Sequence, residues 1–295
     1  MAHDHAESPI ESIIMHVPKA LVLAAPERTD EAMERLRDVS IVRTNDFGFG
    51  FSADSDAREI RVPTSGIELL WAMSLAVWAN YLGHAAPSEP PDRSEWQRLL
   101  EWAILRQSPF EPPTPWPAAL PRPTGFSSYT GNAPPERVAD DLCMCAAGWI
   151  LHHELAHITN GDSGQVGLEL SLEQELEADR SASEWLLSEC REPVMRSKRL
   201  IGVFSALLSM VAVEARFPPK VQRTHPPALN RLQAAIALTD TTRDSAAIAA
   251  AIGGLRLMIP MFGGDLPLDE ESGVDVQSQA HLVAMHRAVS LASRS

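Results

Sequence analysis

The sequence predicts an α+β fold that is mostly α-helical, with a small β-hairpin or sheet in its N-terminal half. Residues 47–53 and 59–62 alternate around a Ser/Asp turn, as the strands of a hairpin do. After Pro135, the apolar residues recur at helical spacing almost to the end of the chain. The length of 295 residues suits one large core. We expect residues 1–135, with the hairpin, and the helical residues 136–295 to form one compact unit.

The elements are expected in a simple order along the chain. A helix covers residues 29–39, the hairpin follows, and two further helices cover 66–82 and 94–106. Twelve of the 23 prolines lie between Pro87 and Pro135, where the missing N–H groups disfavour long helices. This segment is either a surface connection or a lid over a substrate. The predicted helices of the second half are 136–159, 171–188, 194–216, 226–239, 243–257 and 277–292.

Composition and charge exclude several classes of protein. The chain has 25 Lys and Arg residues against 39 Asp and Glu residues, a formal net charge of −14. This argues against nucleic acid or an anionic membrane surface as a partner. The longest apolar run, residues 200–213, is too short to span a bilayer, and the N-terminus lacks the pattern of a signal peptide. Three cysteines form no disulfide framework, so we expect a soluble protein of the cytoplasm.

The segment His153-Glu-Leu-Ala-His157 carries the strongest chemical signal. On a helix, His153 and His157 project from one face, so both imidazoles can bind one metal ion. Residues 142–151 before them are almost wholly apolar, which predicts a central helix whose polar groups need partners. Zn²⁺ suits neutral imidazole and lowers the pKa of a bound water. Glu154 is placed to take the proton of that water as general base.

A second helix, residues 171–188, is expected to supply the third ligand. Its inward stripe turns apolar and contains Glu175 and Asp179, whereas its outward stripe consists of Glu173, Glu177, Arg180 and Glu184. We assign Glu175 to the metal and Asp179 to the ring N–H of a ligand histidine. Asp179 as the ligand is the alternative. Ser171 and Gln174 fit a capping box at the start of this helix, and His152 is expected to be a packing or a solvent-exposed residue.

A third segment, Thr224-His225-Pro226-Pro227, precedes the predicted helix 226–239. Pro226 suits the first helical position, which puts His225 at the positive end of the helix dipole, where imidazolium is disfavoured. His225 is then either a surface residue or a donor that stabilises the oxyanion of a tetrahedral intermediate. A role as fourth ligand, which would close the resting site, is a further alternative.

Together, these three segments resemble the gluzincin metallopeptidases of the HtpX and CAAX-prenyl-protease type. In that family H-E-x-x-H, often with N-G-D after it, is followed by E-x-x-A-D and then by H-P-P with an Arg a few residues on; here the N-G-D is Asn160-Gly161-Asp162 and the Arg is Arg231. The resemblance covers roughly residues 140–235 and implies a zincin-like fold. It implies zinc ligation by His153, His157 and Glu175, with Glu154 as base, Asp179 behind the ligands and His225 as a helper. The short spacing from His157 to Glu175 is similar to ImmA/IrrE-type peptidases. In its acidic composition, its length and its lack of a predicted membrane-spanning segment, the chain is similar to Lit-like phage-exclusion peptidases.

The sequence therefore predicts a zinc metalloendopeptidase that binds one Zn²⁺ ion and hydrolyses a protein or peptide. Residues 47–53 would be an edge strand that pairs with the substrate, or a plain hairpin. A metal-stabilised or degenerate binding module and a hydrolase of a non-peptide amide are the alternatives. A structural zinc usually has a closed shell that includes Cys. Cys143 and Cys145 lie more than two turns before His153, which favours the enzyme.

Overall fold

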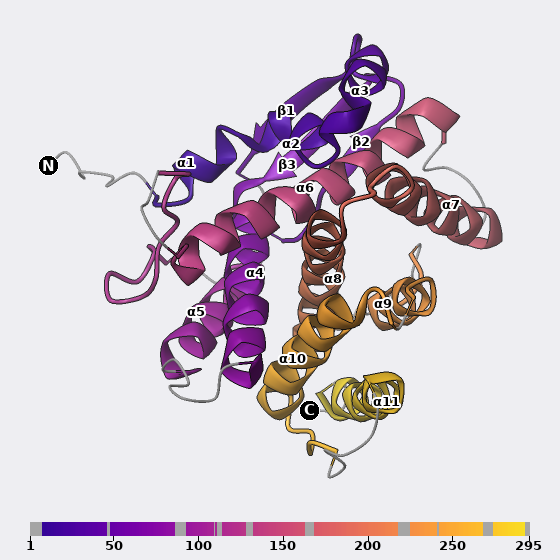
Figure 1. Cartoon of the computed structure of the whole chain (residues 1–295). Helices are drawn as coiled ribbons and strands as arrows, with labels where there is room; N and C mark the ends of the chain where they lie inside the picture. Colours follow the sequence, from indigo (N-terminus) through magenta and orange to yellow (C-terminus); the bar gives the residue numbers. More distant parts are fainter. Residues whose placement is uncertain are drawn as a thin grey trace, which may run out of the picture.

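The computed structural model describes residues 8–45, 48–85, 93–108, 110, 114–127, 132–162, 168–217, 225–240, 242–267 and 274–292. Helices form most of the molecule, and a small sheet lies on one side of them (Figure 1). The N-terminal helices are α1 (Glu11–Ile14), α2 (Val17–Leu23), α3 (Thr29–Arg35), α4 (Thr64–Ala85) and α5 (Arg93–Leu105). The C-terminal helices are α6 (Pro135–Asn160), α7 (Leu168–Leu187), α8 (Pro193–Arg216), α9 (Ala228–Ala237), α10 (Ser245–Met261) and α11 (Val274–Ala292).

Three short strands form the sheet, in the order β1–β3–β2. The central strand β3 (Glu59–Pro63) pairs in parallel with β1 (Ser40–Thr44) and antiparallel with β2 (Ser52–Asp54). The residues after β2 contact the end of α6, where Ser55 Oγ donates to the carbonyl oxygen of His157 at 3.3 Å. Because β2 is at one edge of this sheet, half of its backbone hydrogen-bonding groups point away from β3.

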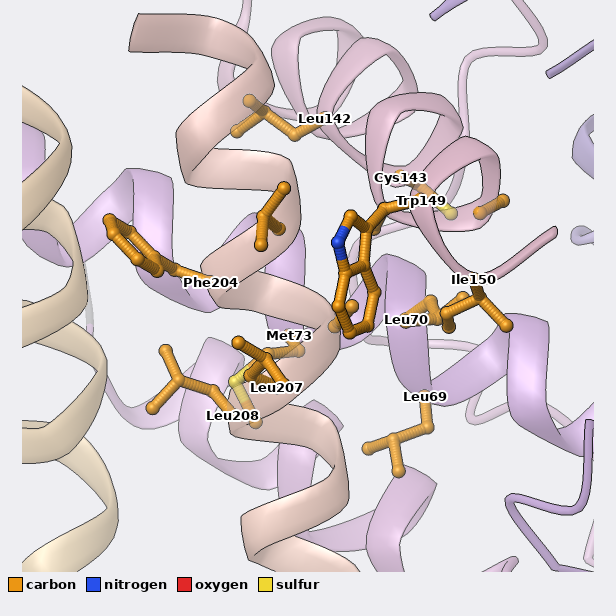
Figure 2. Close-up of a cluster of buried hydrophobic side chains, with 14 of the residues drawn as sticks. Leu69, Leu70, Met73, Leu142, Cys143, Trp149, Ile150, Phe204, Leu207 and Leu208 are labelled. Atoms are coloured by element: carbon orange, nitrogen blue, oxygen red, sulfur yellow. The ribbon is translucent and has the colours of Figure 1, made fainter. Parts of the chain in front are cut away.

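Helix α6 is the centre of the fold and packs against α2, α4, α7 and α8. Its residues 142–151 are all buried, as the apolar run predicts. Figure 2 shows Trp149 and Ile150 of α6 next to Leu70 and Met73 of α4 and Leu207 of α8. Burial of each large side chain contributes about 1.5–3 kcal/mol to stability. This packing gives the last turns of α6, with the two predicted ligand histidines, a fixed position.

Two glycines allow α6 to approach its neighbours closely. A Cβ atom on Gly202 of α8 would lie 2.5 Å from the Cβ of Cys145, and one on Gly148 of α6 would lie 2.5 Å from the Cβ of Ala24. Both distances are far below van der Waals contact, and the neighbours are Cys145 of α6 and Ala24, the residue that caps α2. The axis of α6 is therefore held between α8 and α2.

The N-terminal part differs from the prediction in several places, since α1, α2 and β1 were not predicted. The expected helix 29–39 ends at Arg35, and residues 40–44, for which no element was predicted, form β1. The expected strand 47–53 is a strand only from Ser52, and Phe51 before it packs against the start of α4. A Cβ atom on Gly66 would lie 2.8 Å from the Phe51 ring, which shows how closely the ring fits there. Phe47 lies outside the described residues.

The six predicted helices of the C-terminal half are present, but α7, α9, α10 and α11 begin two or three residues from their predicted starts. Helix α7 begins at Leu168, so Ser171 and Gln174 lie inside it and the predicted capping box is wrong. Helix α9 begins at Ala228 rather than Pro226. A residue before a proline is disfavoured in the helical region, and Pro226 precedes Pro227. His225 therefore lies before the helix start and not at the end of its dipole.

The Pro-rich region is described in part. Residues 114–127 contact α4 and α5 through Trp116, whose ring centroid lies 5.6 Å from that of Trp71 and 4.9 Å from that of Trp102. Trp116 and Leu120 of this part are buried and belong to the hydrophobic core. The choice between a surface connection and a lid stays a prediction. Within the described ranges, no helix has the length and apolar character that a membrane span requires.

The close contact at Gly202 allows the effect of a substitution on the free energy of unfolding to be predicted. Gly202→Ala should lower the free energy of unfolding by about 2 kcal/mol, because overpacking against the Cys145 backbone outweighs the better helix propensity of alanine. Gly50→Ala is the matched control, since a Cβ atom there has nothing within 4 Å, and it should stay within about 0.5 kcal/mol. Urea unfolding of the three proteins measures both. Equal midpoints for Gly202→Ala and the unchanged protein would contradict the close contact.

Candidate metal centre and active site

The C-terminal end of α6 carries His153, Glu154 and His157. Gly161 ends the helix in the left-handed conformation, with φ +67° and ψ +33°, as the sequence predicts for a glycine cap. This turn brings the next residue back over the helix end, and Asp162 Oδ2 lies 2.8 Å from Nδ1 of His157. The turn at Gly161 therefore also places the Asp162 carboxylate against the ring of His157.

Helix α7 brings two more carboxylates to the same place. Glu175 is 6% exposed, and its Oε2 and Oε1 lie 3.4 Å from His153 Nε2 and 3.5 Å from His157 Nε2. Asp179, one turn later, has its Oδ1 3.0 Å from His153 Nδ1. The outward stripe of α7 is exposed, as predicted. Each histidine thus has a carboxylate on its Nδ1 side and shares Glu175 on its Nε2 side.

The donor set of this cluster fits a metal ion. Asp179 and Asp162 accept from the Nδ1–H groups, so each neutral imidazole presents the lone pair of Nε2. The Nε2 atoms of His153 and His157 lie only 3.2 Å apart, and Glu175 Oε2 is buried with no hydrogen-bond partner in the described structure. One ligand atom from each of the three residues lies within 4.8 Å of the others. Such converging lone pairs repel one another unless a cation lies between them.

The electrostatics of the cluster favour a positive charge at the same point. Burial lowers the pKa of His153, but the carboxylates of Asp179 and Glu175 outweigh this effect and raise the pKa to about 9. Burial raises the pKa of Glu175, yet the contacts with His153 bring it below its usual value. The pKa of Asp179 is lowered in the same way, with help from Arg231. A proton supplies the positive charge when no metal does.

Two further side chains donate hydrogen bonds to the carboxylates of Asp179 and Asp162, and neither contact was predicted from the sequence. Arg231 of α9 is buried and donates from Nε to Asp179 Oδ2 at 2.7 Å and from Nη2 to Asp179 Oδ1. Gln174 donates from Nε2 to Asp162 Oδ1 at 3.1 Å. The role of Asp162 was also missed. Its position directly after the glycine cap was the available signal, whereas the contact of Arg231 spans 52 residues.

Glu154 is buried and borders two hollows beside the cluster. One hollow, of about 170 Å³, has an apolar wall made by Phe49, Phe51, Met210 and Val213. The other, of about 240 Å³, is largely polar and runs along β2 from Ser52 to Ser55. Because Glu154 and His225 line both hollows, a chain could pass from one to the other beside them.

His225 lies next to the cluster. Its side chain is 58% exposed, and its Nε2 lies 3.3 Å from Glu175 Oε1. It is not one of the three residues that form the candidate metal group. His152 points elsewhere, with its Nε2 3.1 Å from the carbonyl oxygen of Leu21 and its ring stacked on Trp185. His152 is therefore a packing residue, which is one of the two roles that the sequence left open.

Comparison with known proteins identifies the family. The family model of peptidase U49 matches residues 60–251, well over half of the chain. The cell death peptidase of Escherichia coli (strain K12) is 25% identical over 244 residues, which are 76% of this chain and 80% of that protein. No solved structure matches significantly. These matches support the resemblance to Lit-like peptidases and a peptidase activity. Neither match names a peptidase of the HtpX or CAAX type. The chain belongs to the peptidase U49 family.

Proposed function

We propose that the chain is a zinc-dependent endopeptidase with His153, His157 and Glu175 as the zinc ligands. The convergence of two Nε2 atoms, 3.2 Å apart, on the buried carboxylate of Glu175 carries this proposal, since one oxygen of that carboxylate has no hydrogen-bond partner in the described structure. Three protein ligands leave a coordination position open, as in catalytic zinc sites. A structural site would have four protein ligands. When bound, the zinc supplies a Lewis acid that lowers the pKa of water and polarises a carbonyl group.

In this proposal, Glu154 is the general base. It follows His153 directly, so the helix directs its carboxylate to the side of the histidine pair and towards both hollows. A carboxylate there can accept a proton from the attacking water and pass it to the leaving amine. Asp179 and Asp162 keep the two imidazoles in the tautomer and orientation that the ligands need.

The substrate is proposed to lie extended along β2. The outer edge of β2 has no partner strand in the described sheet and borders the polar hollow, which also contains Glu154 and Glu175. A peptide that pairs with this edge passes Glu154 and can place an apolar side chain between Phe51 and Val213. Hollows on both sides of Glu154 suit a chain that continues in both directions, hence an endopeptidase.

His225 is proposed to act on the substrate rather than on the metal. Its exposed ring faces both hollows, and it can donate a hydrogen bond to the oxygen that becomes negative during attack on the carbonyl. We also propose that the protein works in the cytoplasm. Its three cysteines are free and buried, which suits a reducing compartment.

Glu154→Gln tests the proposed base. The amide keeps the shape of the side chain but cannot accept a proton, so hydrolysis of a casein substrate should fall by about 10²–10⁴-fold. The zinc content should stay near one per chain and the unfolding midpoint should not change. Zinc content by atomic emission and activity on the same preparation separate these effects. A Glu154→Gln protein with full activity would contradict the mechanism.

The choice of Glu175 as ligand is tested by a matched pair of substitutions on one helix. Glu175→Ala should lose most of the bound zinc, because it removes one of three ligands. Glu177→Ala should retain zinc near one per chain, because Glu177 is exposed and pairs with Arg180. Zinc content after dialysis against a weak chelator is the measurement. Loss of zinc in Glu177→Ala, with retention in Glu175→Ala, would reject the ligand set.

The metal affinity should depend on pH with a defined sign. Zinc must displace a proton from the His153 imidazolium, whose pKa the carboxylates of Asp179 and Glu175 raise to about 9 against the effect of burial. The affinity should therefore rise by about tenfold per pH unit from pH 7 and level off near pH 9. Asp179→Asn removes the carboxylate that stabilises the imidazolium and should move the levelling point to lower pH. Competition with a chromophoric chelator measures the affinity. A flat profile from pH 7 to pH 9 would contradict the charged state of His153.

A further inference from the structure

A second hollow lies away from the candidate active site, between the C-terminal ends of α7 and α9 and the start of α8. It has a volume of about 470 Å³ and an apolar floor that includes Leu187, Leu200 and Val203. Leu238, the residue that caps α9, lies on its wall and is 72% exposed. Leu187 is twelve residues after Glu175 on α7, a distance of about 18 Å along the helix. We call this hollow the α7–α9 groove.

Arginines surround the α7–α9 groove. Arg180, Arg191, Arg196 and Arg243 line it, against a single carboxylate, that of Glu184. Two of these arginines are neutralised: Arg180 pairs with Glu177 and Glu184, and Arg196 pairs with the buried Asp244.

Arg191 and Arg243 have no ion-pair partner within the described ranges. Both are exposed and come from adjacent loops, because Arg243 Nη2 donates to the carbonyl oxygen of Cys190 at 3.5 Å. In a chain with a net charge of −14, the groove therefore combines an apolar floor with two exposed guanidinium groups that form no ion pair within the described ranges. The Asp240 carboxylate lies beside Arg243 and accepts from its backbone N–H at 3.1 Å.

We propose that the α7–α9 groove binds an acidic amphipathic helix of a partner protein. The apolar side chains of that helix would cover Leu187 and Leu238, and its carboxylates would reach Arg191 and Arg243. A small amphiphile fits less well, because pockets for such ligands bury most of the ligand, whereas the Leu238 wall is open to solvent. The proposal does not depend on zinc. It places a partner on the two helices that also carry Asp179 and Arg231.

Fluorescence anisotropy with a labelled peptide tests this inference on the full chain. The probe is a helical peptide of about 14 residues with Leu at positions i, i+3, i+4 and i+7 and Glu on the flanks of the apolar stripe. A peptide with every Glu replaced by Lys is its counterpart. We expect the acidic peptide to bind at least about tenfold more tightly than the basic one, and less tightly as salt is added.

Substitutions in the protein locate the binding. Arg191→Glu/Arg243→Glu should weaken binding of the acidic peptide by about tenfold or more, and Leu238→Asp, at an exposed position, should also weaken it. Arg37→Glu/Arg287→Glu is the control, since it changes the net charge equally at exposed arginines elsewhere and should leave binding within about twofold. Failure of the acidic peptide to bind, or equal weakening by the control, would overturn the proposal. Displacement of the peptide by an equal concentration of laurate would also overturn it, in favour of a small amphiphile.

Discussion

The hydrogen bonds between imidazole and carboxylate at the end of α6 are the constraint on which the rest of the site depends. The helix before them is buried on all sides, so the polar groups of His153 and His157 must find partners inside the protein. Asp179 and Asp162 satisfy the two Nδ1 atoms. Because both rings are fixed from that side, their Nε2 atoms face each other and Glu175. The geometry of a metal centre follows from this satisfaction of buried groups.

The surrounding fold can be understood as support for these contacts. Close packing at Gly148 and Gly202 holds α6 against α2 and α8, and α7 is positioned by its contacts with α6. Arg231 links α9 to Asp179 and so ties the segment that carries His225 to the metal centre. Carboxylates that are themselves hydrogen-bonded orient ligand histidines more strictly than free ones do. The arrangement therefore extends from two histidines to five helices, α2, α6, α7, α8 and α9.

Local spacing made the centre of the site predictable from sequence. His153 and His157 share a helix face by their separation alone, and the apolar stripe of α7 identifies Glu175 and Asp179 as inward residues. Asp162, Gln174 and Arg231 were not predictable in this way. Their contacts depend on the path of the chain after Gly161 and on the approach of α9 to α7, which side-chain periodicity does not encode. The parallel strand β1 was missed for a similar reason, since its pairing with β3 is not local.

The central claim is that two imidazoles and one carboxylate bind a zinc ion at the end of α6. X-ray absorption at the zinc K-edge of the zinc-loaded protein tests it most directly. The account predicts scattering from two imidazole rings at about 2.0–2.1 Å, carboxylate oxygen at about 2.0–2.2 Å and no sulfur. All three cysteines are buried away from the cluster as free thiols. A sulfur shell at about 2.3 Å, or scattering from fewer than two imidazoles, would contradict the account.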